Sequence, residues 1–168
     1  MDRNNKTRKM VITAMLAALT CVATMIIKIP SPLKGYINLG DCVVLVAGWL
    51  LSPGYGFFAA GVGSALADVL SGYIIYAPAT LIIKGIMALI AHFVYKILSK
   101  KSKSTGPRVI SGILAEIAMV MGYFLFEGIL YGFGPSVVNI PANAVQGIAG
   151  LILGCLLVKI FERTDIGF

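Results

Sequence analysis

Charged residues are scarce in this chain of 168 residues. Only 12% are charged, whereas 58% are hydrophobic, and the mean hydropathy is +0.92. A soluble domain of this length needs more polar surface to stay dispersed in water. Several apolar runs instead approach the ~20 residues that cross a hydrocarbon core, and no ten-residue alternation favours a β-barrel. We therefore predict an all-α integral membrane protein.

Motifs that carry catalysis are also lacking. The sequence has no GxxxxGK[ST] segment, so a P-loop for ATP is not predicted. The three cysteines, Cys21, Cys42 and Cys155, show no CxxC or metal-binding spacing and are interpreted as small packing residues. No nucleophile and base stand in a recognisable arrangement. We expect no enzymatic activity, no metal site and no cofactor.

Basic residues give the chain a net charge of +7, and they are clustered. They lie at the N-terminus, in the segment 96–108 and at Lys159 and Arg163. This pattern is typical of the positive-inside rule rather than of nucleic-acid binding. The first apolar run has no convincing cleavage site before Lys28, so we interpret it as a span and not as a signal peptide.

The apolar runs predict a single domain, residues 1–168, of six transmembrane helices. Their expected ranges are 8–27, 41–51, 56–72, 76–98, 108–131 and 136–161. The second is short, about 17 Å at ~1.5 Å per residue, and Asp41 is placed to cap it. The Lys-rich loop 99–107 falls inside only if this short helix crosses, so both termini are predicted to be cytoplasmic.

Lys84 lies within the otherwise apolar run 77–95. An ionisable residue inside a membrane is by default a candidate functional residue. Distances along the helices place Lys84 ~12 Å below the outer surface, and Asp68 and Glu127 ~6 Å below it. A structural alternative is a salt bridge from Lys84 to Asp68 or Glu127 that only fixes the helices.

Amide side chains on the last span share this outer half. Asn139, Asn143 and Gln146 are spaced i, i+4, i+7 and therefore lie on one helix face. Four tyrosines lie at compatible levels: Tyr73, Tyr76, Tyr123 and Tyr131. Such a lining predicts a ligand pocket that opens to the outside. The alternatives are interhelical hydrogen bonds for the amides and an interfacial belt for Tyr76 and Tyr131.

The first loop is expected beside the mouth of this pocket. It contains Lys34, Tyr36 and Asn38 and ends at Asp41. Prolines stiffen it and glycines permit turns, so it is a candidate lid, with an ordinary connection as the alternative.

Two polar residues, His92 and Glu116, are expected in the inner half. The helices that carry them are predicted to be antiparallel neighbours, which places the two side chains at a similar level. A His–Glu pair there is a candidate proton site or coupling element. The alternatives are a satisfied internal pair, which is the commoner arrangement, and a rotation of the helices that separates the two side chains.

Three segments and one spacing resemble a known family. The segments are YINLGD at 36–41, PATLIIKG at 78–85 and PANAVQG at 141–147, and Ala14 and Ala18 are similar to an AxxxA motif. Together they resemble the S components of energy-coupling factor (ECF) vitamin transporters, with similar size and six-span topology over essentially the whole chain.

The resemblance implies a substrate-binding subunit of the bacterial cell membrane. It implies capture of a vitamin under the first loop, docking of the Ala14 and Ala18 face on a transmembrane coupling subunit, and delivery by toppling, powered by two cytoplasmic ATPases. Our candidate binding residues are Lys34, Tyr36, Asn38, Asp41, Asp68, Tyr76, Lys84, Tyr123, Glu127, Asn139, Asn143 and Gln146.

The motifs are most similar to S components for hydroxymethylpyrimidine or pyridoxine-type vitamins. A small aromatic heterocycle suits tyrosines for stacking and amides for hydrogen bonds. Riboflavin and pantothenate S components share related segments, whereas a thiamine-type site implies more tryptophans than the single Trp49. Two different functions also fit these residues: a self-contained proton-coupled transporter using His92 and Glu116, and a structural membrane protein without a ligand.

Overall fold

The computed structural model describes residues 3–31, 36–100 and 104–163, and the side chains of 6–31, 36–100 and 104–160 within them. The helices are α1 (Arg3–Ile26), α2 (Gly40–Leu50), α3 (Pro53–Leu70), α4 (Ala77–Ser99), α5 (Gly106–Tyr131), α6 (Phe133–Val137) and α7 (Ile140–Arg163). Two strands, β1 (Ile29–Pro30) and β2 (Tyr36–Ile37), pair antiparallel. Within these residues, the six helices other than the five-residue α6 confirm the predicted six-helix, all-α membrane fold.

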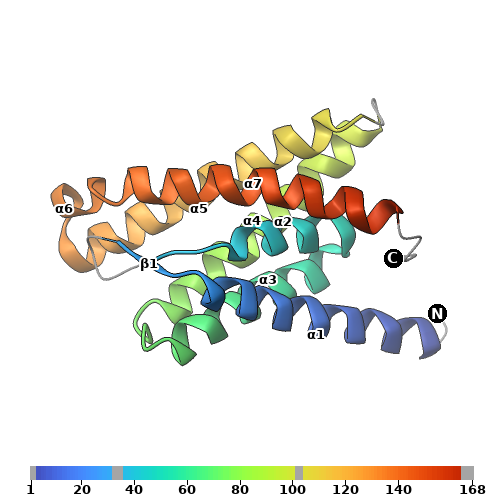
Figure 1. Ribbon diagram of the computed structural model, residues 1–168, viewed down its shortest axis with the longest axis horizontal. Helices are drawn as coiled ribbons and strands as arrows, with labels where there is room; N and C mark the ends of the chain where they lie inside the picture. Colours follow the sequence, from blue (N-terminus) through green and yellow to red (C-terminus); the bar gives the residue numbers. More distant parts are fainter. Residues whose placement is uncertain (1–2, 32–35, 101–103, 164–168) are drawn as a thin grey trace.

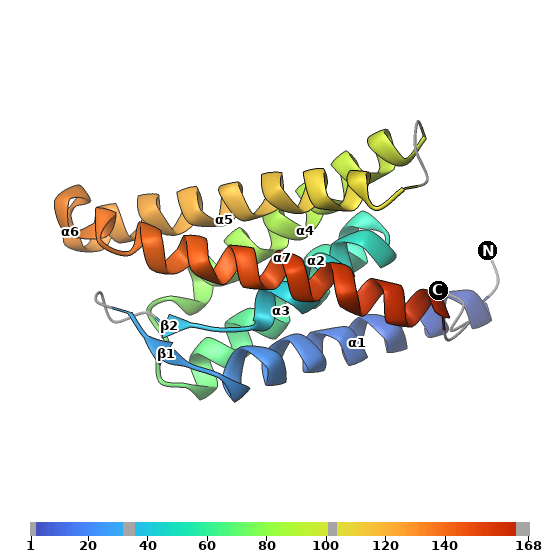
Figure 2. The same cartoon turned by 45° about the horizontal axis from the view of Figure 1, so that its top comes forward.

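The helices lie side by side along the long axis of the molecule (Figure 1). α1 begins and α7 ends at one end, where α4 also ends and α5 begins, while β1, β2 and α6 lie at the opposite end (Figure 2). Four stretches are long and apolar enough to cross a membrane: Lys6–Ile26, Ala77–Ser99, Gly106–Tyr131 and Phe133–Ile160. The strands and α6 were not predicted, and the inside–outside orientation stays a prediction.

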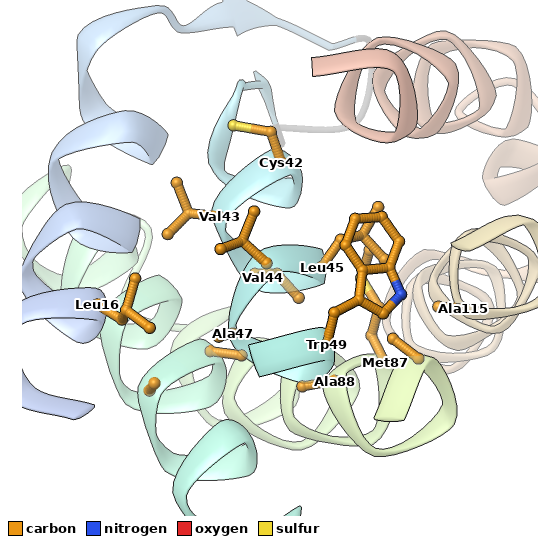
Figure 3. Close-up of a cluster of buried hydrophobic side chains, with 14 of the residues drawn as sticks. Leu16, Cys42, Val43, Val44, Leu45, Ala47, Trp49, Met87, Ala88 and Ala115 are labelled. Carbon is orange, nitrogen blue, oxygen red and sulfur yellow. The ribbon is translucent and has the colours of Figure 1, made fainter. Parts of the chain in front are cut away.

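The short helix α2 forms the centre of the bundle. Ten of its eleven residues are buried, and it packs against α1, α3, α4 and α7. Apart from Asp41, its sequence is apolar on every side, as expected for a helix surrounded by others. Figure 3 shows Val44, Leu45 and Trp49 of α2 among side chains of the neighbouring helices. A central position explains how so short a helix is stabilised, since its packing partners surround it.

The predicted cap of α2 is wrong. Leu39 precedes the helix and makes no capping hydrogen bond, while Asp41 is the second helical residue and is fully buried. The Asp41 carboxylate is not available to cap the helix because it binds side chains of α4 and α7, Lys84 and Gln146.

The outer surface of the bundle is apolar, as expected for a protein solvated by lipid. Met15 of α1, Ile117 of α5 and Ile148 of α7 are each more than half exposed. Ala14 and Ala18 also lie on the exposed side of α1. This side of α1 is therefore not used for packing within the bundle.

Candidate functional site

A polar pocket lies at the end of the bundle that carries β1 and β2. It is formed by the first loop and by α3, α4, α5 and α7, and its lining residues are Ser31, Tyr36, Asn38, Asp68, Tyr73, Tyr76, Thr80, Tyr123, Glu127, Asn143 and Gln146. Eight of the twelve predicted binding residues are among them. The structure therefore brings together side chains that are up to 110 positions apart in the sequence, from Tyr36 to Gln146.

An ion pair lies behind this lining. Lys84 binds Asp41 Oδ1, and these residues are 2% and 0% exposed, respectively. Asp41 Oδ2 accepts a hydrogen bond of 2.7 Å from Gln146 Nε2. The alternative salt bridge from Lys84 to Asp68 or Glu127 is not the one formed, because the buried first turn of α2 places Asp41 directly against α4.

The ammonium of Lys84 has a second favourable neighbour. Its Nζ lies 5.5 Å from the centroid of the Tyr123 ring, which lines the pocket. A cation over an aromatic face is attracted by the ring quadrupole. Lys84 thus supports one pocket wall from behind, through Tyr123.

Gln146 joins the ion pair to the first loop. Its Oε1 accepts hydrogen bonds from the backbone nitrogen of Asn38 at 2.9 Å and from Asn38 Nδ2 at 3.2 Å. Asn38 Oδ1 in turn accepts a bond of 2.9 Å from the Gly40 nitrogen. One amide therefore connects α7, the loop that precedes α2, and the carboxylate of Asp41.

Tyr36 anchors the other part of the first loop. Its hydroxyl donates a 2.7 Å hydrogen bond to Asp68 Oδ1 on α3, and its ring lies 4.7 Å from that of Tyr73. Burial, and then the nearby charge of Asp68, raise the pKa of the Tyr36 phenol, so it remains a neutral donor. The predicted contact residue Lys34 lies outside the described residues.

The third cluster is built around Glu127 on α5. Its Oε1 accepts hydrogen bonds from Asn139 Nδ2 at 2.8 Å and from the Tyr76 hydroxyl at 3.4 Å. Nearby, the hydroxyls of Thr80 and Tyr123 lie 3.0 Å apart. Asn139 therefore lies beside Glu127 and supports it, rather than being part of the lining.

Several buried oxygen atoms of this site can accept further hydrogen bonds. Among the described residues, the buried atoms Asp68 Oδ2, Glu127 Oε2 and Asn139 Oδ1 have no hydrogen-bond partner. None of the described lining residues is Lys or Arg. The described part of the wall consequently presents carboxylate acceptors without a Lys or Arg among them.

Sequence reasoning left three lining residues out of the candidate set: Ser31, Tyr73 and Thr80. Thr80 had a detectable signal, since Tyr76, Thr80 and Lys84 repeat every four residues and share a helix face. Ser31 is brought to the pocket by the β1–β2 pairing, which has no clear pattern in so short a segment.

The pocket is nearly filled by its own side chains. The space that a water-sized sphere can occupy is about 30 Å³. A ring-shaped ligand therefore requires the tyrosines or the first loop to move outward. The two loop anchors, Tyr36 and Asn38, are the contacts that such a movement would break.

The predicted pairing of His92 with Glu116 is not formed. His92 Nδ1 lies 3.2 Å from the Gly48 carbonyl of α2, while both oxygens of Glu116 lack a hydrogen-bond partner among the described residues. Glu116 instead faces glycines of α7, because Gly147 and Gly150 leave space beside it. The two side chains thus contact different helices.

The helical membrane fold and the polar pocket at one end of the bundle are features of a ligand-binding membrane protein. Residues 4–163 match the family described as "ECF-type riboflavin transporter, S component". The chain therefore belongs to this family. It is a multi-pass transport subunit of the cell membrane and not an enzyme. ECF S components bind a vitamin and associate with the ECF energising module.

Two curated relatives span most of the chain. An uncharacterised protein of Pyrococcus woesei is 40% identical over 143 residues, which cover 84% of this chain and 93% of the relative. The thiamine precursor transporter HmpT of Lactococcus lactis is 27% identical over 165 residues, covering 97% and 93%.

Two solved structures share the fold. The S component of a bacterial ECF transporter superposes with a TM-score of 0.76 at 24% identity, covering 95% of this chain and 98% of that one. The S component for biotin from an ECF-type transporter gives a TM-score of 0.60 at 22% identity, covering 95% of each chain. These likenesses establish the S-component fold.

Proposed function

We propose that this S component captures a small aromatic vitamin or precursor with amino or hydroxyl donors, of the hydroxymethylpyrimidine or pyridoxine type. It delivers this cargo by docking on a coupling subunit that separate ATPases power. Support for the cargo comes from the relative HmpT, whose name specifies a thiamine precursor. The family description names riboflavin, so riboflavin is the principal competitor.

The observation that carries the proposal is the pair of unused carboxylate oxygens, Asp68 Oδ2 and Glu127 Oε2. Both residues line the pocket together with four tyrosines. A carboxylate accepts hydrogen bonds and favours a donor or a positive charge, while tyrosine rings stack on a heterocycle. An aminopyrimidine supplies both features: a flat ring and an exocyclic amine.

An anionic cargo such as pantothenate fits this lining poorly. Lys84 is already paired with Asp41 and lies behind Tyr123. A ligand carboxylate would face Asp68 and Glu127 without a described Lys or Arg in the wall. Like charges at close range repel strongly in a site of low dielectric constant.

Size also favours a small ring over riboflavin. Because the free space is about 30 Å³, every ligand has to displace side chains. A single ring displaces fewer of them than a tricyclic flavin with its ribityl chain. Packed cores resist such displacement, so the smaller cargo requires less rearrangement.

The docking surface that we propose is the exposed side of α1. Ala14 and Ala18 are exposed there, whereas Leu16 and Thr20 of the same helix are buried in the bundle. Small residues four apart let a partner helix approach closely. The competing idea of a self-contained proton relay loses its main support because His92 and Glu116 contact different helices.

Isothermal titration of the purified protein with hydroxymethylpyrimidine tests the cargo. We expect Asp68→Asn and Glu127→Gln each to weaken binding by about tenfold to a hundredfold, since a hydrogen bond to a charged group contributes ~1.5–3 kcal/mol. Val69→Ala is the matched control, because Val69 is 46% exposed beside Asp68. Parallel titrations use pyridoxine, riboflavin and pantothenate. Binding of riboflavin or pantothenate that is stronger than that of both hydroxymethylpyrimidine and pyridoxine would refute the proposal.

A further inference from the structure

Glu116 is a buried acid that the ligand pocket does not use. It is 7% exposed on α5 and lies at an apolar groove between α5 and α7 with a volume of about 320 Å³. Both its oxygens are buried without a hydrogen-bond partner among the described residues. An ionised carboxylate in apolar surroundings without donors is strongly unfavourable, whereas the protonated acid is tolerated.

The glycines of α7 place this acid beside the ion pair of Lys84. A Cβ at Gly150 would lie 3.1 Å from Glu116 Oε1 and 2.6 Å from Asp41 Cβ. A Cβ at Gly147 would lie 2.9 Å from Glu116 Oε2. Both acids therefore border the space that is left because Gly150 has no side chain. At this distance Glu116 interacts electrostatically with both Asp41 and Lys84.

The charges around Glu116 do not balance if both acids are ionised. The titratable groups that face it are Asp41 and Cys42 from α2 and Lys84 from α4, while α7 presents Gly147 and Gly150 there. His92 on α4 contacts the Gly48 carbonyl instead. Lys84 thus has one positive charge for two carboxyl groups, and two carboxylates that share such a site do not both ionise readily.

We propose that Glu116 binds a proton in this state and serves as the reserve counter-ion of Lys84. Asp41 holds the ammonium while the network with Gln146 and Asn38 is intact. When Lys84 loses Asp41, Glu116 releases its proton to the bulk solvent, and its carboxylate neutralises the ammonium. The buried cation is then never left without an anion.

This arrangement would let the wall of the ligand pocket rearrange at a lower electrostatic cost. Asp41 is bonded to Gln146, which lines the pocket and holds the first loop through Asn38. A movement of that loop reaches Asp41 through two hydrogen bonds. Leaving either charge of a buried pair unmatched costs several kcal/mol, and a second acid nearby avoids that penalty for Lys84.

Infrared spectroscopy of the purified full-length protein in lipid tests the proposal without any ligand. In the difference between wild type and Glu116→Gln at neutral pH, we expect the loss of one carboxylic acid C=O band and no loss of carboxylate absorption. In Asp41→Asn, we expect the acid band of Glu116 to disappear while its carboxylate bands appear. The double variant Asp41→Asn/Lys84→Met removes the cation, so the acid band should remain.

Two outcomes would overturn the proposal. The first is loss of carboxylate absorption in Glu116→Gln, which would mean that Glu116 is ionised in the native state. The second is an unchanged acid band in Asp41→Asn, which would mean that Glu116 does not replace Asp41. Asp41→Ser removes the same charge and takes the place of Asp41→Asn if that variant does not fold.

Discussion

Replacing Lys84 with methionine tests the buried ion pair most severely. The substitution leaves the Asp41 carboxylate at 0% exposure with one described side-chain donor, Gln146 Nε2 at 2.7 Å. Breaking a buried pair by removing one partner costs about 3–5 kcal/mol, because the other charge stays buried. We therefore expect Lys84→Met to lower the free energy of unfolding by about that amount.

The reverse substitution, Asp41→Asn, should cost distinctly less. Lys84 then has Glu116 as a second anion, whereas Asp41 has no second described cation. Reversible unfolding in mixed micelles of detergent and SDS measures both variants, and the double variant Lys84→Met/Asp41→Asn completes the cycle. Equal costs for the two single variants would refute the reasoning about the reserve anion. A coupling energy near zero would refute the pair itself.

Three further predictions concern binding and transport. Asn143→Ala removes an amide from the pocket lining and should weaken cargo binding roughly fivefold in calorimetry, which corresponds to ~1 kcal/mol for one hydrogen bond. An unchanged affinity would mean that Asn143 does not contact the cargo. Tyr36→Phe deletes the 2.7 Å hydrogen bond to Asp68 and should speed ligand dissociation about tenfold, since a hydrogen bond to a charged group contributes ~1.5–3 kcal/mol. Stopped-flow release measures the dissociation rate, and an unaltered rate would show that Tyr36 does not hold the loop closed. Ala14→Trp should leave binding intact but block cellular uptake, because an indole prevents close helix approach, and Ile129→Trp, at a position 80% exposed on α5, is the control that should spare both.

The helices were predictable because their signal is local. Long apolar runs predicted α1, α4, α5 and α7 within a few residues of their bounds, and a shorter run predicted α2. The charge pattern favours a membrane crossing by α2, which stays a prediction. The strands β1 and β2 were not predictable, because two-residue strands carry no periodicity.

The members of the site were more predictable than their partners. Depth along each helix placed Asp68, Glu127, Asn143 and Gln146 in the same half of the bundle, and the structure places all four in the pocket lining. Which acid binds Lys84 depends on how the helices are rotated and on how deeply α2 is buried. Spacing along one helix does not contain that information, so in the sequence Asp41 resembles a helix cap.

The surroundings of Glu116 were also not predictable from the sequence. Its level in the bundle suggested His92 as a partner, because the two helices are neighbours. The gap left by Gly147 and Gly150 instead turns the acid toward α7. Glycines spaced along a helix indicate close packing, which is correct for α7. The sequence does not show which neighbouring side chain occupies the space beside them.

Mass spectrometry of small molecules that copurify with the protein tests the central claim most directly. The protein is purified in mild detergent from cells supplied with hydroxymethylpyrimidine, pyridoxine, riboflavin and pantothenate, and the bound fraction is released and identified. The account predicts hydroxymethylpyrimidine or a pyridoxine-type vitamin near one equivalent, with clear depletion in Asp68→Asn. Riboflavin or pantothenate at that occupancy, or the same occupancy in Asp68→Asn, would contradict it.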